Sequence, residues 1–503
     1  MAIYTYLHIG SNMLALLHLQ ALKIKQEINE HAVLNVTAKL LEKSEISYVR
    51  NVRALDKIEI INDKLEYKTI FKGVVKKVEI KQIEKSYFLL IEALSSSFLA
   101  DIEVTSRSFQ NKDQTYYSVV DEAIKTPFSK GLFTKNAIRK IGEIDDQITN
   151  GKTTGKFIMQ YKETDWEFIK RISSHFYMGL VPSLLFDSPK ITMGIPKGVN
   201  RGKIEKYNFI VKKDMEKFLN ISYNTDFELE KGTVFTELDA VSFYIETTEN
   251  FDIGDMLSYQ YHTEDTQISF LYVKSKTTEM IDGVLRYQYE LTTEGGFAVA
   301  KIYNEKIVGL SLKAKVLERI QDNIKVFLEI DKTPPTLSQA WEFHYTTPYT
   351  AEGSAGWYVM PELEDTVHIY FPNKKEECAV GLNAIRLNNT GTDKIGNPEI
   401  KYLRTRDGKE LKLSNDELVL TCANWKNEQT GEENKIYIQL NEKSGITIQS
   451  TKPIYICSDG SVNFVSDKDI VFEALEEIKL KCGSSQIKLD ASIEINSSVV
   501  KVN

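Results

Sequence analysis

From Ile446 to its end the chain carries apolar residues in pairs, and the first five pairs each begin eight residues after the one before. The two members of a pair are separated by one position, which is the period of a β-strand. Turn-formers and charges, such as Ser458-Asp459-Gly460, separate the pairs. A fixed period in short strands indicates a solenoid or a fibrous array. The regular pairs are Ile446/Ile448, Ile454/Ile456, Val462/Phe464, Ile470/Phe472 and Ile478/Leu480, and the looser continuation is Ile487/Leu489, Ile493/Ile495 and Val500/Val502.

One ribbon of this kind buries too little apolar surface to offset the conformational entropy lost on ordering it. Partner chains that share one core would cover both the apolar face and the unpaired backbone edges. We therefore expect an intertwined, trimeric β-helix (a β-prism), with an ordinary β-meander sheet as the open alternative. The predicted trimer core consists of Ile446, Ile448, Ile454, Ile456, Val462, Phe464, Ile470, Phe472, Ile478, Leu480, Ile487 and Leu489.

Upstream of this array the pattern also predicts a mainly β protein. Residues 19–104 alternate as strands, most clearly where Val74, Val78 and Ile80 face away from the intervening lysines and glutamate. Gly73 stands where a strand must bend or bulge. Strands resume over residues 206–245 and 270–293, which indicates a second curved antiparallel sheet.

Two helices interrupt the strands. Residues 115–124 have helical spacing of apolar residues, and Pro127 stops that helix. The second helix begins at Thr164-Asp165-Trp166-Glu167, a capping box in which Thr164 caps the Glu167 amide and Glu167 reaches back. Trp166 and Phe168 are expected to pack in the core rather than to stack on a ligand.

Four short motifs, in order along the chain, carry a resemblance to a known family. Residues 160–171 (QYKETDWEFIKR) resemble the Q-Y-x-E-(S/T)-D-x-x-F-x-x-R segment of VgrG-type spike proteins, and residues 107–111 (RSFQN) resemble their R-x-F-Q-(D/N) segment. Residues 71–75 (FKGVV) resemble the family's F-x-G-x-V strand, and residues 253–255 (IGD) its (L/I)-G-D turn. The resemblance implies the trimeric hub and central spike of a contractile injection machine.

Two further segments extend this resemblance towards the C-terminus. Residues 361–365 (PELED) are similar to the family's P-E-x-G-D motif, although Glu364 stands where the family usually has glycine. Residues 404–413 (RTRDGKELKL) are similar to its entry to the spike. The implied organisation is a phage-tail-hub-like region with two β-barrel subdomains over residues 1–305, with helices near 115–127 and 164–177, an OB-fold barrel over 306–388, a linker over 389–400 and a spike over 401–503.

The resemblance also implies partners. Three chains would form the hub and spike, and the hub would meet tail tube and baseplate proteins. Blunt spikes of this family are capped by a small PAAR-like tip protein, which we expect to bind the apolar end at Val499, Val500 and Val502. The assembled needle would be driven through a target cell envelope.

Composition narrows the functional classes. Lys plus Arg is 63 and Asp plus Glu is 71, a net charge of −8 that argues against nucleic-acid binding. The N-terminus shows neither a basic leader before an apolar run nor a small-residue cleavage site. We therefore expect synthesis in the cytoplasm without a signal peptide. The resemblance implies assembly at the tip of a tail-like particle that acts outside the cell or in the target envelope.

The sequence predicts no catalytic residues, metal ligands or cofactor. Its seven histidines are scattered, its four cysteines form no C-x-x-C, and no local motif suggests a Ser/His/Asp set. The aromatic residues between Trp341 and Trp357 could form a glycan-binding or nucleic-acid-binding platform, but structural packing is favoured. Two alternative functions stay open: a host-binding adhesin or tail fibre, and a cell-wall hydrolase associated with a spike.

Overall fold

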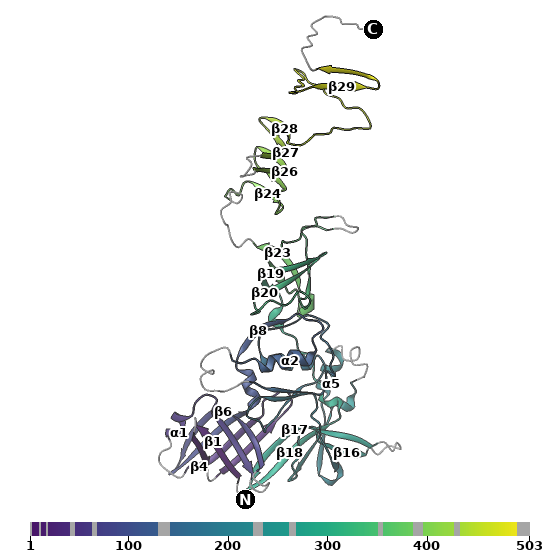
Figure 1. The fold of residues 1–503 in the computed structure, drawn as a ribbon. Coiled ribbons are helices and arrows are strands. Elements are labelled where there is room, and N and C mark those ends of the chain that lie inside the picture. Colours follow the sequence, from purple (N-terminus) through teal and green to yellow (C-terminus); the bar gives the residue numbers. More distant parts are fainter. Residues whose placement is uncertain are drawn as a thin grey trace. The chain divides into compact units, whose positions relative to one another are not determined.

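The computed structural model describes residues 3–9, 12–16, 19–40, 46–62, 68–128, 141–224, 235–260, 268–350, 356–385, 396–426 and 433–489. The contacts divide the chain into unit 1, Met1–Leu387, and unit 2, Asn388–Asn503, each of which is described by itself. The described part of the chain is mainly β-structure with a few short helices (Figure 1).

A sheet of thirteen strands forms the larger part of unit 1. Its two halves meet where β3 pairs with β17, with Gln26 opposite Lys276. Strands β13 (Asn200–Lys203) and β16 (Met256–Gln260) join it through β17. The order along the sheet is β14 (Phe209–Lys213), β15 (Val241–Thr247), β18 (Val284–Thr292), β17 (Ile268–Ile281), β3 (Leu19–Gln26), β4 (Val33–Leu40), β7 (Ser86–Ser95), β6 (Lys68–Ile83), β5 (Lys57–Asn62), β1 (Ile3–Ile9) and β2 (Asn12–Leu16).

The alternation predicted from the sequence is what buries one face of this sheet. Leu34 and Val36 of β4 lie in the same hydrophobic core as Phe243 of β15 and Leu291 of β18, so one core spans both halves. The two β-barrel subdomains expected over residues 1–305 stay a prediction, and the structure adds that the two halves are joined. In the described residues the two halves form one continuous sheet, because β3 and β17 are hydrogen-bonded neighbours.

Gly73 lies inside β6, where a Cβ atom would come within 2.1 Å of the Leu94 carbonyl oxygen. The strand is not interrupted there. The register shifts instead between Val75 and Lys77, two residues further along. Glycine is thus required by the close approach of β7, and the bulge predicted at Gly73 occurs beside it.

A second layer of unit 1 packs around both predicted helices. Helix α2 (Tyr116–Lys125) is capped by Thr115 and ends two residues before Pro127, as predicted. Helix α4 (Asp165–Ser174) begins with the predicted capping box at Thr164. The other elements of this layer are η2 (Ser96–Asp101), β8 (Val104–Phe109), β9 (Glu143–Asp146), β10 (Ile158–Thr164), β11 (Leu180–Pro182) and β12 (Lys190–Met193).

Two of the described helices of unit 1 were not predicted. Helix α1 (Ile46–Asn51) interrupts the first run of strands, and helix α5 (Met215–Asn224) lies within residues 206–245, which were predicted as strands. In α5 the amide of Lys217 donates to Asp214, a helix-start signal that the alternation obscured. Short 3₁₀ turns η3 (Ile204–Lys206), η4 (Glu237–Ala240), η5 (Gly295–Phe297) and η6 (Glu305–Ile307) complete the connections.

The last part of unit 1 is a closed five-stranded barrel, in the order β19-β20-β21-β23-β22. Strand β21 pairs in parallel with β23, whereas the other pairs are antiparallel. Its core is filled by side chains such as Val316, Val326 and Ile369. The strands are β19 (Ser311–Ile320), β20 (Asn323–Leu328), β21 (Glu342–Tyr345), β22 (Thr366–Tyr370) and β23 (Val380–Ile385), with η8 (Glu376–Cys378) before β23.

Unit 2 begins as a five-stranded antiparallel meander. Of the eight-residue array, only the first pair, Ile446 and Ile448, lies in this meander, in its last strand. Residues 451–477 contain no strand, and a hairpin of β29 (Ile478–Cys482) and β30 (Ser485–Leu489) follows. The meander strands are β24 (Lys401–Arg404), β25 (Glu410–Leu413), β26 (Glu417–Lys426), β27 (Glu433–Asn441) and β28 (Gly445–Ser450).

Candidate functional site

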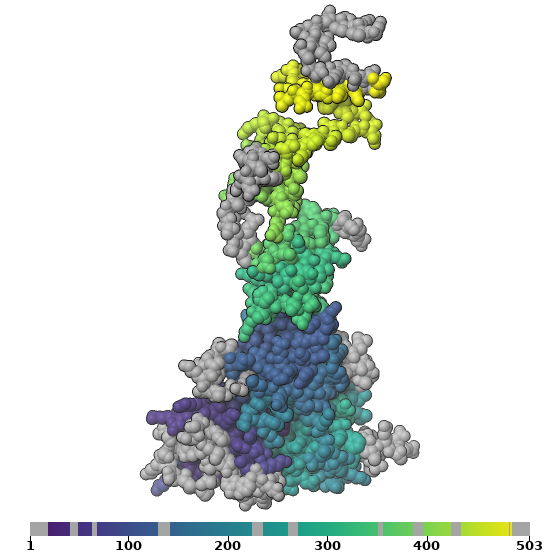
Figure 2. All heavy atoms as spheres, viewed as in Figure 1, coloured from purple at the N-terminus to yellow at the C-terminus, as the bar shows by residue number. Residues whose placement is uncertain are grey.

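The predicted trimer-core residues of unit 2 are exposed in the single chain. Ile446 has 72% of its surface exposed and Phe472 has 66%. Figure 2 shows the described atoms of this unit in green to yellow. Exposure is shared by Ile446, Ile448, Ile454, Ile456, Val462, Phe464, Ile470, Phe472 and Leu480, whereas Ile478 is half-buried and the side chains of Ile487 and Leu489 lie outside the described residues.

The exposed apolar side chains are arranged in a regular way. The rings of Phe464 and Phe472, one repeat apart, make an edge-to-face contact at 6.1 Å. A groove of about 690 Å³ runs over the meander, lined by Leu403, Leu420 and Ile448 among others. The predicted tip residues Val499, Val500 and Val502 lie outside the described residues.

A second candidate site lies in unit 1, where the second layer meets the small barrel. Strand β10 takes part in two cores because its side chains alternate. Ile158 faces the core around α2 and α4, whereas Phe157 and Met159 face the core of the barrel. We call the contacts made around β8, β10 and α4 the barrel joint.

The two motifs that resemble the spike family pair with each other in this joint. Strands β8 and β10 are antiparallel neighbours that place Arg107 opposite Gln160. The Arg107 guanidinium donates to the Gln160 side chain at 2.8 Å and to the buried Asp165 carboxylate at 2.7 Å. Asp165 also accepts from Gln160 at 3.0 Å. Both motifs therefore contribute to a single polar cluster beneath the start of α4.

Arg171 connects this cluster to the barrel. Its guanidinium is buried and donates to both Glu163 carboxylate oxygens, at 2.8 and 2.9 Å, and to Glu376 at 2.8 Å. It also donates to the Met159 carbonyl at 2.8 Å. Burial lowers the pKa of Arg171, but the carboxylates of Glu376 and Glu163 outweigh it, so the pKa is raised and the side chain stays charged.

Further hydrogen bonds cross the joint from β8. The Ser108 amide and hydroxyl donate to the two oxygens of Asp331, at 2.6 and 2.5 Å. Gln110 donates to the Val326 carbonyl at 3.3 Å and accepts from the Trp341 amide at 3.2 Å. Every bond in this set joins the second layer to the barrel, so the joint fixes the barrel through directional contacts as well as through shared apolar packing.

Comparison with known proteins identifies the fold. No protein-family model matches the sequence, and no curated protein matches it. A chain of the lidded Francisella PdpA–VgrG complex aligns over 90% of this chain and 80% of its own length, with 10% identity and a TM-score of 0.55. A chain of the lidless PdpA–VgrG complex covers 89% and 97%, with 10% identity and a TM-score of 0.51.

The Escherichia coli c3393 protein, described as a type VI secretion component similar in structure to the T4 bacteriophage tail proteins gp27 and gp5, covers 73% of this chain and 97% of its own. Its identity is 11% and its TM-score is 0.51. The chain has the VgrG-type spike fold.

The Ile253-Gly254-Asp255 motif also has a structural role in this fold. Gly254 has a φ of +94° and lies where a Cβ would be 2.2 Å from the Pro196 carbonyl oxygen. The buried Asp255 accepts from the Val199 amide at 2.9 Å and from Arg201 at 2.7 Å. The Ile253-Gly254-Asp255 turn therefore fastens the segment before β13 to the large sheet.

A Ser–His–Asp arrangement is present that sequence reasoning missed. His31 Nδ1 lies 2.8 Å from the Ser97 hydroxyl, and Nε2 lies 3.2 Å from Asp101. Burial raises the pKa of Asp101, but hydrogen bonds from His31 and Thr164 outweigh it and hold the pKa below its usual value. Ser97 is 0% exposed and its hydroxyl also contacts that of Ser95 at 2.8 Å. Because Ser97 is not exposed, its hydroxyl cannot reach a substrate. The hydrogen bonds among Ser97, His31 and Asp101 therefore hold η2 in place.

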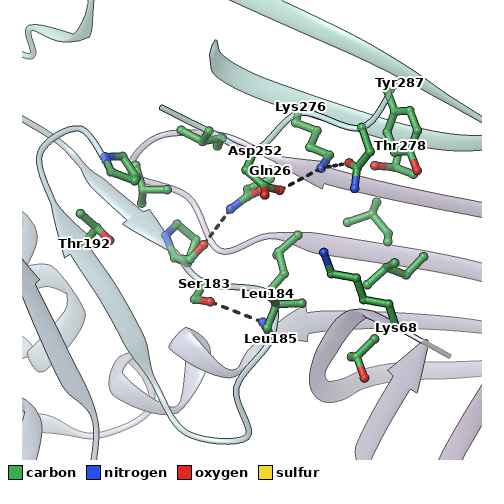
Figure 3. Close-up of a pocket in the computed structure, with 18 residues that line it drawn as sticks. Gln26, Lys68, Ser183, Leu184, Leu185, Thr192, Asp252, Lys276, Thr278 and Tyr287 are labelled. Carbon is green, nitrogen blue, oxygen red and sulfur yellow. Dashed lines mark hydrogen bonds and ion pairs between the residues drawn. The ribbon is translucent and has the colours of Figure 1, made fainter. Parts of the chain in front are cut away.

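A cavity of about 210 Å³ lies near the seam between the two halves of the large sheet (Figure 3). The ammonium of Lys276 donates to Asn250 at 2.6 Å and faces Asp252 at 3.4 Å. Burial lowers the pKa of Lys276, and Asp252 opposes this effect. Gln26 donates to the Pro182 carbonyl at 2.8 Å. The buried side chains of Gln26 and Lys276 are therefore already bonded to protein partners.

The aromatic residues noted in the sequence divide into two groups. Phe343 and Tyr345 are in the barrel core and Trp341 packs against it. Tyr349 and Trp357 are exposed, and with Tyr358 they line a cavity of about 530 Å³ at the side of the barrel.

The described residues lack two kinds of feature. No helix there is long and apolar enough to cross a lipid bilayer. Nor do the described histidine, cysteine, aspartate and glutamate side chains gather into a group of three or more that could hold a metal ion.

Proposed function

We propose that this chain is the hub-and-spike subunit of a contractile injection machine and that it works as a homotrimer. The observation that carries the proposal is the exposed, eight-residue array of apolar side chains in unit 2, on a chain with the VgrG-type fold. Apolar surface of this extent is not kept in water without a partner. Two further copies with the same period would supply a matching surface along the whole array.

The finer architecture follows from the same proposal. Residues 401–503 would form a trimeric β-helix in which strands of neighbouring chains cover the open edges. The closed barrel, with β21 parallel to β23 and β22 returning to β19, would be an OB-fold barrel within residues 306–388. Residues 1–305 would form the phage-tail-hub-like ring that meets tail tube and baseplate proteins, and residues 389–400 would link barrel and spike.

The proposed action is mechanical. Sheath contraction would drive the trimer, with a PAAR-like tip protein on Val499, Val500 and Val502, through a target envelope. The particle would carry the protein at its tip after assembly in the cytoplasm. The buried polar contacts of the barrel joint resist separation of barrel and hub under load, because each leaves an unpaired buried group when it is broken. No catalytic step is assigned to the chain.

Sedimentation of the purified full-length chain tests the assembly. The chain mass is 57.5 kDa, and we expect a species of about three times that mass that persists on dilution. A folded monomer at micromolar concentration would contradict the proposal. Zymography on peptidoglycan is expected to show no clearing, whereas clearing would support the hydrolase alternative.

One observation favours a second function, binding of host glycans. Trp357 is 62% exposed, and its neighbours Tyr349 and Tyr358 line the same cavity. Exposed aromatic faces beside polar groups are typical of carbohydrate sites. A glycan array on the trimer would test this second function. Binding that Trp357→Ala abolishes would support an adhesin role, whereas no binding would indicate that these aromatic residues serve in protein contacts.

A further inference from the structure

The two halves of the large sheet repeat one pattern of strands. The first half has the order β3-β4-β7-β6-β5, and the second half has the order β14-β15-β18-β17-β16. In both, the strand that comes first in the chain pairs with the second, which pairs with the fifth, followed by the fourth and the third. All of these pairs are antiparallel. We call the two halves the first repeat and the second repeat.

The long hairpins of the two repeats agree residue by residue. Each hairpin has one register shift, at the same distance from a turn of the same length. Lys76 of the first repeat is bonded to Glu92 at 2.7 Å. At the counterpart positions of the second repeat, Lys274 is bonded to Glu290 at 2.7 Å. The other counterparts are Val75 and Val273, Lys77 and Ser275, Ile83 and Ile281, and Ser86 and Val284.

The turn that leads into the third strand is also the same in both repeats. Asp56 precedes β5, and its carbonyl accepts from the Val75 amide at 2.8 Å. Asp255 precedes β16, and its carbonyl accepts from the Val273 amide at 2.8 Å. The residue before each aspartate has a positive φ, +71° in the first repeat and +94° in the second. The large sheet therefore contains the same five-stranded motif twice.

One strand pair joins the two repeats. Strand β3 of the first repeat pairs with β17 of the second, and Ile24 lies opposite Thr278. Both residues are covered by this contact, because they are 3% and 4% exposed. The counterpart contact would join β14 of the second repeat to β6 of the first. Within the described part of the chain that contact is not made.

The strands of the missing contact are exposed. Following the pairings of β4 and β15 makes Val211 the counterpart of Ile24, and Phe209 the counterpart of Leu22. Val211 is 49% exposed and Phe209 is 41% exposed, whereas Leu22 is 1% exposed. Residues 76–83 of β6 have no strand on their outer side among the described residues. Exposed edges of this kind are sites at which a strand of another chain adds.

We propose that β14 of one chain pairs with β6 of the neighbouring chain in the trimer, in the register of the internal contact between β3 and β17. The inference rests on the proposed homotrimer. The register places Val211 opposite Ile80 of the partner subunit, and Lys212 opposite Glu79 of the partner subunit. Apolar thus meets apolar, and opposite charges face each other across the strands.

The proposed contact is head-to-tail, because two different edges of the chain meet. Such a contact forms a closed ring if the rotation between copies closes, and an open filament if it does not. Three copies would close a ring in which the contact within each chain and the contact between chains have the same geometry. Both the outer side of β14 and the outer side of β6 would then be covered.

Oxidative cross-linking of the full-length chain tests this contact. The Lys212→Cys/Glu79→Cys variant places thiols on facing positions, where antiparallel strands hold Cα atoms about 4.5–5.5 Å apart, within the range of a disulfide. After mild oxidation with diamide, a denaturing gel without reductant should show a covalent trimer as the main product. Each chain carries one thiol of each kind, so a head-to-tail ring links all three chains, whereas a two-fold contact would stop at a dimer.

Two controls accompany this variant. The single variants Lys212→Cys and Glu79→Cys report cross-links made through the four native cysteines, and they should give no more covalent product than the unchanged protein. The Lys212→Cys/Lys85→Cys variant tests the register. Lys85 lies in the turn after β6, about 20 Å along the strand from Glu79, so this variant should form no covalent trimer.

Three results would overturn the inference: no covalent product from a Lys212→Cys/Glu79→Cys variant that sediments as a trimer, a product that stops at the dimer, or equal cross-linking through Lys85→Cys. Each of these leaves the proposed homotrimer standing with a different hub contact. A folded monomer of the unchanged protein would instead contradict the proposed function, and sedimentation measures that separately.

Discussion

Units 1 and 2 carry the same apolar alternation, and only in unit 1 does the chain cover its own apolar face. Leu34 and Val36 of β4 face Phe243 and its neighbours across a common core. Ile446 and Ile448 of β28 alternate in the same way and stay exposed. Alternation therefore predicts a strand with one apolar face, and it does not say which chain covers that face.

The two units also differ in how they hold their charges. Unit 1 buries the guanidinium of Arg171 between Glu163 and Glu376. In unit 2, ion pairs such as Lys443 with Asp416, at 3.4 Å, are exposed in the single chain. A buried pair requires one geometry, whereas an exposed pair tolerates many. Unit 1 thus has a structure specified by its own contacts, whereas in the proposed trimer the specificity of unit 2 would come from its partners.

The largest expected effect is on the trimer, and Phe472→Ser produces it. Phe472 belongs to the predicted shared core. Replacing it by serine should lower the free energy that stabilises the trimer by about 3–5 kcal/mol per chain, and each trimer contains three such sites. Sedimentation across a dilution series should show dissociation at concentrations where the unchanged protein is trimeric. The unfolding transition of unit 1 should not move.

Val471→Ser is the matched control for that change. Val471 is 79% exposed in the single chain, and the eight-residue pattern places it on the opposite face from Phe472. We expect the trimer to persist. Equal dissociation by both variants would show that the two faces do not differ and would refute the predicted core, returning unit 2 to an ordinary meander with an unexplained apolar surface.

The next largest effect is expected in the barrel joint. Glu376→Ala leaves the buried Arg171 with one carboxylate fewer. Breaking such a buried pair lowers the free energy of unfolding by about 3–5 kcal/mol. Urea unfolding followed by tryptophan fluorescence measures it, because Trp166 lies at the start of α4. Asp416→Asn, which removes an exposed carboxylate of unit 2, should change the midpoint far less. Similar losses in both variants would argue against a special role for the joint.

The ends of the two predicted helices are decided by neighbouring residues, and these could be found in the sequence. The capping box at Thr164 and the stop at Pro127 placed both helices correctly. Helix α5 was missed because Phe218, Ile221 and Tyr223 are also good strand formers, and the Asp214 cap was overlooked.

Contacts between distant residues had no such signal. Arg171 and Glu376 are 205 positions apart, and His31 and Ser97 are 66 apart. No spacing rule connects these residues, so the joint and the buried Ser–His–Asp set required the fold. The family motifs marked both β8 and β10, but nothing in them showed that the two strands pair.

A smaller effect concerns acid stability in unit 1. Burial raises the pKa of Glu290, but Lys274 at 2.7 Å and the Ser242 hydroxyl outweigh it, so the pKa lies below its usual value of 4.5. A lowered carboxyl pKa contributes stability above pH 4.5 that is lost as the pH falls through the folded-state value. Between pH 5.5 and pH 3 the urea midpoint should therefore fall less in Glu290→Gln than in the unchanged protein.

Glu279→Gln is the control for this pH dependence, because Glu279 faces Lys23 only at 3.9 Å on the surface of the same sheet. Its midpoint should follow the unchanged protein at every pH. If both variants shift the acid branch equally, the effect is one of net charge and not of the Lys274–Glu290 pair.

The smallest effect is expected at Glu364, the position where the family usually has glycine. The residue has a φ of +69°, in the left-handed region, and its carboxylate pairs with Lys315 at the surface, at 3.5 Å. A side chain there costs about 1–2 kcal/mol, while glycine loses about 0.5–1 kcal/mol more entropy on folding. Glu364→Gly should therefore stabilise the barrel by up to about 1.5 kcal/mol, seen as a higher urea midpoint. Leu363→Gly, one residue earlier and not in the left-handed region, should lower the urea midpoint. A lower midpoint in both variants would show that the turn depends on the Glu364 side chain rather than on its backbone conformation.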